Sequence, residues 1–290
     1  MFTGALTALI TPFRDGEVDA PALRDLIEWQ IQSGIDGLVP CGSTGESATL
    51  THAEHDSVIK ITIEQTRKRV PVIAGTGSNS TAEAIRLTAA AREMGADGAL
   101  LLSPYYNKPT QDGIYRHYKT IAASVDIPMF VYNIPGRTAS NILPETVARL
   151  AEIKNIVGIK EASGSMDQSS DILKMCGDRI MILSGDDALT LPVMALGAKG
   201  VISTCSNIVP REMHDLAAAA LGGDFAKARE IHFRLLPTMR ALFVETNPIP
   251  VKQALAFMGK CANELRMPLV QMTAGPADKL RIAMKELRLV

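Results

Sequence analysis

A lysine stands at the end of a short apolar run, where its amine could act as a nucleophile. The run is 156–159, and it is followed by Lys160 and the turn-forming residues 161–165. Branched residues and glycine bounded by turn formers predict a parallel strand that is covered on both faces. A buried ammonium is costly there unless the protein uses it. Lys160 could form a Schiff base with a keto acid; the alternative is that its side chain simply extends to water.

Schiff-base chemistry requires a neutral amine. The pKa of a free lysine is about 10.4, so only about one amine in two thousand is neutral at pH 7. Lowering this pKa to roughly 7 to 8 requires about 4 kcal/mol of bias against the charged form, which burial and a nearby cation can supply.

A tyrosine and an arginine follow the preceding strand candidate, in the segment 132–138. Tyr132 is the best candidate for proton transfer, because a phenol can pass a proton between a carbinolamine and a second hydroxyl without carrying a charge at rest. Arg137 offers a planar guanidinium that suits a carboxylate.

Two adjacent hydroxyls lie between two glycines in the segment Gly42-Ser43-Thr44-Gly45. Backbone N–H groups and hydroxyls in such a turn can converge on one small anion, such as a carboxylate. The alternative is an ordinary Gly/Ser turn.

Two further segments follow strand candidates. Tyr105 and Tyr106 lie between two prolines. They could take part in catalysis, and they could also pack against a partner subunit. The segment 184–187 could suggest a metal, but no histidine lies nearby. We favour a structural role, in which Gly185 lets the backbone approach a ligand and Asp187 caps the next helix.

The elements that would position these residues repeat along the chain. Short apolar strand candidates recur roughly every 20 to 35 residues, each followed by a segment with helical periodicity. The candidates are 5–10, 37–40, 72–74, 98–102, 129–132, 156–160, 180–183 and 200–203. Helix starts are expected after Asp19, Thr51 and Ser80. Eight such units predict an α/β fold, a (β/α)₈ TIM barrel, with functional residues at the carboxyl ends of the strands.

The pattern changes to helices alone from about Gly223 onward. Helical segments are expected at 225–244, 250–258 and 277–287, separated by prolines. We therefore predict two domains, a catalytic barrel over 1–223 and a small all-helical appendage over 224–290.

Composition excludes several classes of function. The chain has 290 residues, with 30 basic and 31 acidic side chains and a net charge of -1, so no nucleic-acid partner is expected. No apolar run reaches the roughly 18 residues of a membrane span, and we expect neither a membrane partner nor a signal peptide. The four cysteines, Cys41, Cys176, Cys205 and Cys261, are widely spaced. They favour reduced thiols in a cytoplasmic protein.

With these residues in place, the chain resembles the dihydrodipicolinate synthase and N-acetylneuraminate lyase family over nearly its full length. The matching pieces are the segments 42–46 and 132–135 and Lys160 after its apolar strand. Three such pieces, in the right order at three barrel junctions, are highly specific. The segments 103–109, 135–138 and 247–252 are similar to the synthase branch of the family.

The resemblance implies a class I aldolase-type reaction. Lys160 would condense with pyruvate, and the resulting enamine would attack L-aspartate 4-semialdehyde to give 4-hydroxy-tetrahydrodipicolinate, on the diaminopimelate route to lysine. Tyr132 would exchange protons through Thr44 with Tyr106 from the adjacent subunit. Arg137 would hold the carboxylate of the second substrate. The pyruvate pocket would be lined by Ser43, Thr44, Gly185 and Ile202. No metal or other cofactor is implied.

One departure from the family pattern concerns the anion-binding turn. Many members have two threonines where this chain has Ser43 and Thr44. Serine keeps the hydroxyl but lacks the methyl group that restricts the rotamer.

The histidines of His52-Ala53-Glu54-His55 leave three readings open. They could offer two metal ligands or lie on a solvated helix face. The resemblance implies instead a feedback site for L-lysine at a subunit interface, in a homotetramer built from two dimers. Its residues would be Ser47, Ala48, His52, His55, Asn79, Glu83 and Tyr105.

Two rival functions remain. A neuraminate or other sugar-keto-acid lyase of the same family would share Lys160 and Tyr132, but it would need polar contacts for a polyol rather than Arg137. A non-catalytic amino-acid sensor would keep only the second site.

Overall fold

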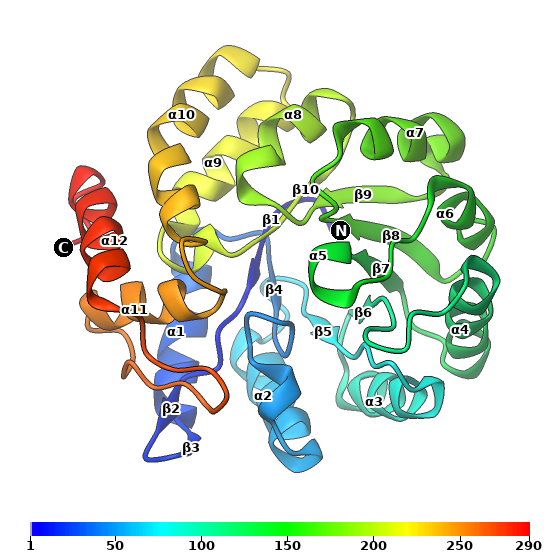
Figure 1. The fold of residues 1–290 in the computed structure, drawn as a ribbon, viewed down its shortest axis with the longest axis horizontal. Helices are drawn as coiled ribbons and strands as arrows, with labels where there is room; N and C mark the ends of the chain where they lie inside the picture. Colours follow the sequence, from blue (N-terminus) through cyan, green and yellow to red (C-terminus); the bar gives the residue numbers. More distant parts are fainter. Residues whose placement is uncertain (1) are drawn as a thin grey trace.

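Eight parallel strands form a barrel in the computed structural model, which describes residues 2–290 (Figure 1). The strands are β1 (Gly4–Ala8), β4 (Gly37–Val39), β5 (Ile73–Gly75), β6 (Gly98–Leu102), β7 (Met129–Asn133), β8 (Ile156–Glu161), β9 (Met181–Ser184) and β10 (Gly200–Ser203). Their order is β4-β1-β10-β9-β8-β7-β6-β5. A parallel bridge between Leu38 and Val72 joins the two ends, so the TIM barrel predicted from the sequence is confirmed.

Helices connect the strands and surround the barrel (Figure 1). They are α1 (Ala20–Gln32), α2 (His52–Thr66), α3 (Thr81–Met94), α4 (Gln111–Ser124), α5 (Pro135–Thr138), α6 (Pro144–Leu150), α7 (Met166–Cys176), α8 (Thr190–Ala195) and α9 (Pro210–Leu221). Short 3-10 turns are η1 (Ser47–Thr49), η2 (Gly177–Arg179), η3 (Asp187–Leu189) and η4 (Cys205–Asn207). A two-stranded hairpin, β2 (Phe13–Arg14) and β3 (Glu17–Val18), precedes α1.

The three expected helix caps are confirmed. The Asp19 side chain accepts from the backbone N–H of Ala22 at the start of α1. Thr51 forms a capping box with Glu54, and Ser80 caps α3. Each cap satisfies a backbone N–H that has no partner within the helix, which fixes where the connecting loop ends.

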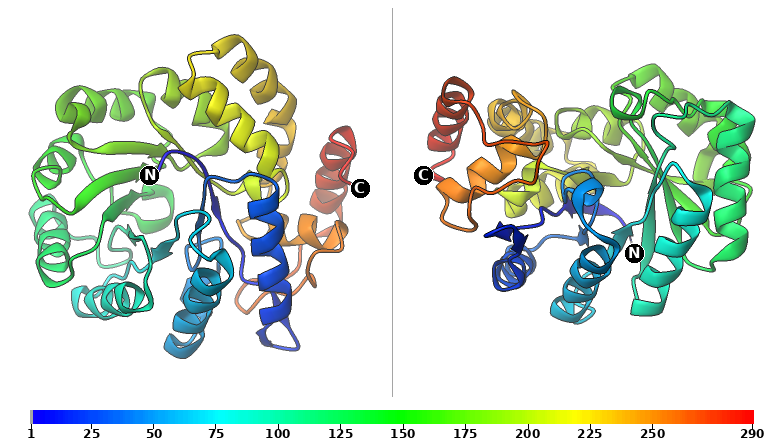
Figure 2. Two further views of the ribbon diagram at one scale, coloured as in Figure 1. Left: turned by 180° about the vertical axis from the view of Figure 1, so that it is seen from behind. Right: turned by 60° about the horizontal axis from the view of Figure 1, so that its bottom comes forward.

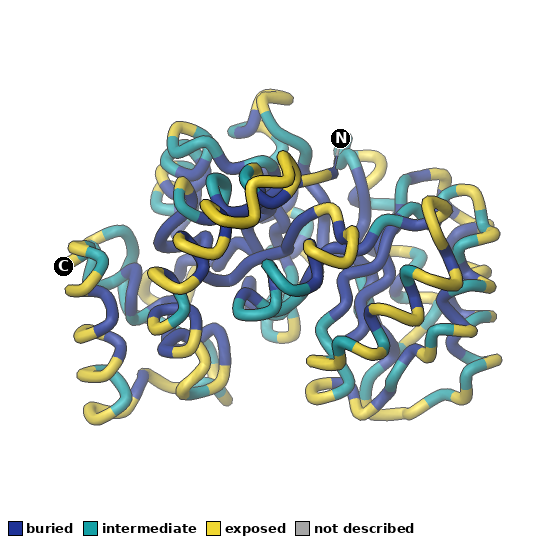
Figure 3. The backbone as a smooth tube through the Cα atoms, turned by 90° about the horizontal axis from the view of Figure 1, so that it is seen from above, coloured by how far each residue is buried: buried dark blue, intermediate teal, exposed yellow. Residues whose placement is uncertain are grey.

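Apolar side chains fill two layers. The inner layer lies inside the barrel and includes Leu6, Ile73, Phe130, Leu183 and Ile202. A larger layer lies between the strands and the surrounding helices. Figure 3 shows the interior of the molecule as mostly buried, while the exposed stretches lie on its outside. Because the strands are covered on both faces and the helices on one, the strands appear in the sequence as nearly continuous apolar runs and the helices as amphipathic segments.

The helical appendage follows the barrel and lies beside α1 and α9 (Figure 2). It contains α10 (Phe225–Ala241), α11 (Ile249–Phe257) and α12 (Ala274–Glu286). Because α9 ends at Leu221 and α10 begins at Phe225, we keep the proposed domain boundary between residues 223 and 224. In the described part of the chain, no helix is both long and apolar enough to cross a bilayer.

Candidate active site

Lys160 lies near the carboxyl end of β8, opposite Tyr132 of β7 in the strand register. Its side chain is buried, and its Nζ lies 4.2 Å from the centre of the Tyr132 ring. Burial lowers the pKa of Lys160 to about 7, with a further lowering from Arg137, while the Asp187 carboxylate opposes the shift. Near neutral pH, this amine is therefore divided between its charged and neutral forms.

The Tyr132 phenol lies beside this amine in the barrel interior. Burial raises its pKa to about 12, and Arg137 and the Ser43 side chain partly offset the rise. The phenol thus stays protonated at neutral pH and can both donate and accept a hydrogen bond. Ser43 and Tyr132 also line one small cavity together.

The turn after β4 has a strained backbone at both ends. Cys41 and Glu46 have φ values of 56° and 53°, in the left-handed region that non-glycine residues seldom adopt. A Cβ at Gly45 would lie 3.1 Å from the backbone oxygen of Leu9, so a glycine allows this close approach. Between them, Ser43 and Thr44 present their side chains in different directions.

The neighbours of these two hydroxyls bear on the predicted relay through Thr44, which stays a prediction. The Thr44 hydroxyl accepts a hydrogen bond from the Asn247 side chain at 2.9 Å, so it is directed toward the appendage. Ser43 instead lines a small cavity together with Tyr132, and its side chain partly offsets the raised pKa of that phenol. The two side chains are adjacent in the sequence, and only the path of the strained turn decides which of them lies beside the phenol.

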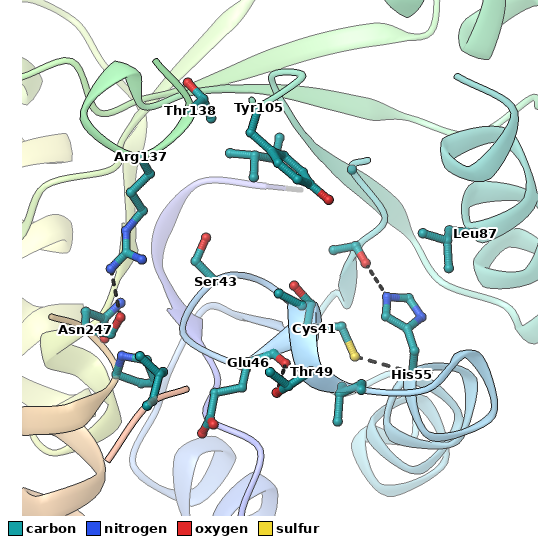
Figure 4. Close-up of a pocket in the computed structure, with 18 of the residues that line it drawn as sticks. Cys41, Ser43, Glu46, Thr49, His55, Leu87, Tyr105, Arg137, Thr138 and Asn247 are labelled. Carbon is teal, nitrogen blue, oxygen red and sulfur yellow. Dashed lines mark hydrogen bonds between the residues drawn. The ribbon is translucent and has the colours of Figure 1, made fainter. Parts of the chain in front are cut away.

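Arg137 lies in α5 on the wall of a cavity of about 460 Å³. Its guanidinium donates to the backbone oxygen of Asn247 at 2.8 Å, which holds it across the opening from Ser43 (Figure 4). The remaining N–H groups of the guanidinium can receive an anion that enters the cavity.

Gly185 and Ile202 lie at the ends of neighbouring strands. A Cβ at Gly185 would lie 3.0 Å from Cε of Lys160, so only glycine leaves the lysine its present space. Ile202 belongs to β10 and packs in the barrel interior. Gly185 therefore lies beside Lys160, and the pyruvate pocket predicted from the sequence stays a prediction.

The predicted helix cap at Asp187 is wrong. Asp186 caps η3 instead, by accepting from the N–H of Ala188. The Asp187 carboxylate is buried and accepts from the N–H groups of Thr204 and Cys205 at 3.1 and 2.9 Å. Burial raises the pKa of Asp187 to about 6, although these hydrogen bonds lower it.

The predicted lysine-binding residues lie largely around the same cavity. Six of the seven line it, namely Ser47, Ala48, His52, His55, Glu83 and Tyr105. The Nε2 atom of His52 contacts Glu83 at 3.0 Å, and buried His55 contacts the backbone oxygen of Gly75 at 2.9 Å. Asn79 donates to the backbone oxygen of Tyr105 at 3.1 Å, so it supports the cavity wall from behind.

Tyr106 lies outside this cavity. Its side chain is 89% exposed, although it follows Tyr105, whose ring points into the cavity (Figure 4). A large aromatic side chain in this position is available for contact with another molecule.

A family model described as the dihydrodipicolinate synthetase family matches residues 1–287. The chain belongs to this family. It is 60% identical to the 4-hydroxy-tetrahydrodipicolinate synthase of Syntrophus aciditrophicus (strain SB), over 100% of both chains. It also superimposes on dihydrodipicolinate synthase from Aquifex aeolicus with a TM-score of 0.98 and 53% identity, covering 99% of each chain. The sequence-based prediction of a lyase of this family is confirmed.

Two structural relatives in the dihydrodipicolinate synthetase family carry small molecules. The enzyme from Acinetobacter baumannii is complexed with pyruvate; it is 44% identical, with a TM-score of 0.99 and 100% of both chains covered. The enzyme from Cyanidioschyzon merolae has lysine bound; it is 41% identical, with a TM-score of 0.97 and 100% and 99% of the two chains covered. A third relative is described as a monomeric variant, so the fold alone does not fix the number of subunits.

Sequence reasoning missed the role of the appendage in this family member. In the sequence, the segment 247–252 carries only a resemblance to the synthase branch, yet Asn247 contacts both Thr44 and Arg137. Repeated prolines in that segment could have indicated a fixed loop.

Among residues 2–290, no group of three or more His, Cys, Asp or Glu side chains is arranged to hold a metal.

Proposed function

We propose that this enzyme condenses pyruvate with L-aspartate 4-semialdehyde through a Schiff base on Lys160. The observation that carries the proposal is a buried amine with a pKa of about 7, next to a protonated phenol in a barrel. An anion-binding turn and an arginine lie around the same opening. These groups meet the needs of imine formation from an α-keto acid.

The first half-reaction uses the lysine and the phenol. The neutral amine of Lys160 attacks C2 of pyruvate, and the carbinolamine loses water to give a protonated imine. The imine withdraws electrons, so a proton leaves C3 and an enamine forms. Tyr132 lies beside the lysine and passes these protons. The turn at Ser43 and Thr44 receives the pyruvate carboxylate through its N–H groups.

The second half-reaction forms a carbon–carbon bond. The enamine carbon attacks the aldehyde carbon of the semialdehyde, and the new alkoxide takes a proton from Tyr132. The amino group of the second substrate then attacks the imine carbon, closes the ring and releases Lys160 as 4-hydroxy-tetrahydrodipicolinate forms. Arg137 binds the carboxylate of the second substrate.

We propose that the proton path runs from Tyr132 through Ser43 to Tyr106 of the partner subunit. The exposed Tyr106 supports a contact between subunits, and the small cavity that Ser43 and Tyr132 line together supports a path between those two side chains. We accordingly propose a homo-oligomer, built as a dimer of dimers, located in the cytoplasm. All four cysteines are free, which agrees with that location.

Steady-state kinetics with defined substrates test the proposed function. We expect turnover of pyruvate with L-aspartate 4-semialdehyde and no cleavage of N-acetylneuraminate. Substantial cleavage of N-acetylneuraminate in the absence of condensation would favour the sister lyase instead.

We also propose feedback inhibition by L-lysine at the cavity residues around Glu83. The Glu83 carboxylate can pair with an ammonium, and its pKa is held low by hydrogen bonds from Ser78 and His52. We expect millimolar lysine to reduce the rate and Glu83→Gln to weaken the inhibition about tenfold or more, because an ion pair is lost. A dose series without any loss of rate in the parent enzyme would contradict this proposal.

A further inference from the structure

Two sequence segments that the proposed mechanism leaves partly unexplained meet beside the active site. One is the anion-binding turn. The other is the loop from α10 to α11, in which the segment 247–252 begins. Asn247 of this loop is 6% exposed, and its Nδ2 donates to Oγ1 of Thr44 at 2.9 Å. This is the hydrogen bond that the structure shows for the Thr44 hydroxyl, and it joins residues separated by 203 positions.

The backbone of the same residue holds the opposite side of the opening. The carbonyl oxygen of Asn247 accepts from Arg137 at 2.8 Å (Figure 4). One residue of the appendage therefore contacts two groups of the barrel, a residue of the anion-binding turn and the entrance arginine. In the proposed function, these groups bind the carboxylates of the two different substrates.

The loop that carries Asn247 is itself firmly fixed. Lys252, one turn into α11, is fully buried and forms an ion pair with Glu46 at the end of the anion-binding turn. Its Nζ also donates to the backbone oxygen of Glu264 at 2.8 Å and lies 4.0 Å from the centre of the Phe13 ring. Buried charges persist only where they are paired and hydrogen-bonded, so this contact holds the loop and the turn in one arrangement.

We propose that Asn247 is a positioning residue for pyruvate, an inference that rests on the proposed function. Its side-chain amide fixes the Thr44 hydroxyl, and through it the orientation of the turn whose N–H groups receive the pyruvate carboxylate. The Oδ1 atom of Asn247 is buried without a hydrogen-bond partner, so the contact with Thr44 is what orients the amide. Its carbonyl, in contrast, serves Arg137 and does not depend on the side chain.

The substitution Asn247→Ala separates these two contacts. It removes the hydrogen bond to Thr44 and keeps the carbonyl that holds Arg137. We expect the KM for pyruvate to rise about 5- to 10-fold, because one buried hydrogen bond is lost. The KM for the semialdehyde should change by less than about twofold, because the Arg137 contact remains.

Asn263→Ala is the matched control. Asn263 also lies in the appendage, also has a buried Oδ1 without a partner, and donates to Gln253 away from the cavity. We expect this variant to keep both KM values of the parent enzyme. Equal losses of thermal stability in the two variants, with unchanged KM values, would show a purely structural role for Asn247 and overturn the proposal.

A double-mutant cycle tests whether the effect passes through Thr44. Thr44→Val should raise the KM for pyruvate as Asn247→Ala does, and the double variant should add less than about twofold to either single effect. Additive effects would contradict the inference, and Asn247→Ser provides the same cycle if Asn247→Ala does not fold.

Borohydride trapping across pyruvate concentrations distinguishes a failure of the proposed function from a failure of the role of Asn247. No adduct in the parent enzyme would refute the proposed function, whereas adducts with the same concentration dependence in all variants would refute only the role of Asn247.

Discussion

At the residue scale, the environment of one amine determines the chemistry. Burial is the main cause that lowers the pKa of Lys160, and two charged neighbours act in opposite directions. Arg137 favours the neutral amine, and Asp187 favours the ammonium and a cationic imine. The site therefore holds a neutral amine near neutral pH and still provides a negative charge close to the imine that the proposed mechanism forms.

The first prediction concerns the pH dependence of pyruvate capture. Because the pKa of Lys160 is lowered to about 7, the neutral amine predominates above that pH and is lost below it. We expect kcat/KM for pyruvate to be level above about pH 7 and to fall about tenfold per unit below it. In Asp187→Asn the inflection should move to lower pH, since the charge that raises the pKa is gone. A rate that continues to rise up to pH 10 would contradict this assignment.

The second prediction separates the two hydroxyls of the turn. Ser43→Ala should lower kcat by about tenfold or more, because it removes a group from the proton path of Tyr132. Thr44→Val should chiefly raise the KM for pyruvate. Single-turnover and steady-state kinetics compare the two variants, and a larger loss of kcat in Thr44→Val would restore the relay first expected from the sequence.

At the scale of elements, parallel strands bring residues from distant segments to one edge. The register of β7 and β8 places Tyr132 opposite Lys160, and Gly185, which directly follows β9, lies beside the lysine. Alternating apolar runs, turns and caps predicted these elements, because each signal is local. The choice between Ser43 and Thr44, the partners of Asp187 and the role of Asn247 depend on contacts between distant segments. No pattern in the sequence alone specifies those contacts.

The third prediction uses the close approach at Gly185. An added Cβ would lie 2.6 Å from Cβ of Ala162 and 3.0 Å from Cε of Lys160, so β8 or the lysine must move. We expect Gly185→Ala to lose about 1–3 kcal/mol of stability and most of its rate of adduct formation. Gly136→Ala is the control, because beyond its chain neighbours and its own helix backbone no atom lies within 4 Å of its Cβ position. Thermal unfolding and borohydride trapping measure both effects, and equal behaviour of the two variants would contradict the account.

At the scale of the whole molecule, one chain supplies every proposed catalytic group except Tyr106, which the proposed proton path takes from a second copy of the chain. Tyr106 is exposed while Tyr105 lines the cavity, so a second copy of the chain is needed for the proposed proton path. The appendage, in turn, packs against the barrel and holds the turn after β4 through Asn247 and the Lys252–Glu46 ion pair. Neither the exposure of Tyr106 nor these contacts of the appendage follow from the repeated strand and helix pattern that predicts the barrel.

The fourth prediction tests the exchange of Tyr106 between subunits. Tyr106→Phe and Lys160→Ala should each be nearly inactive by themselves. Mixing the two after dissociation should restore activity, because a mixed dimer contains one site with an intact lysine and a tyrosine from its partner. If Tyr106 served its own chain, no site in the mixed dimer would be complete, and activity would stay at the level of the separate variants.

The fifth prediction, and the most direct test of the account, is the trapping of pyruvate on the enzyme. Incubation with pyruvate and borohydride, followed by peptide mass spectrometry, should show one reduced pyruvate adduct on Lys160 and none in a folded Lys160→Ala variant. An adduct at another lysine, or undiminished condensation of the two substrates by Lys160→Ala, would contradict the Schiff-base mechanism.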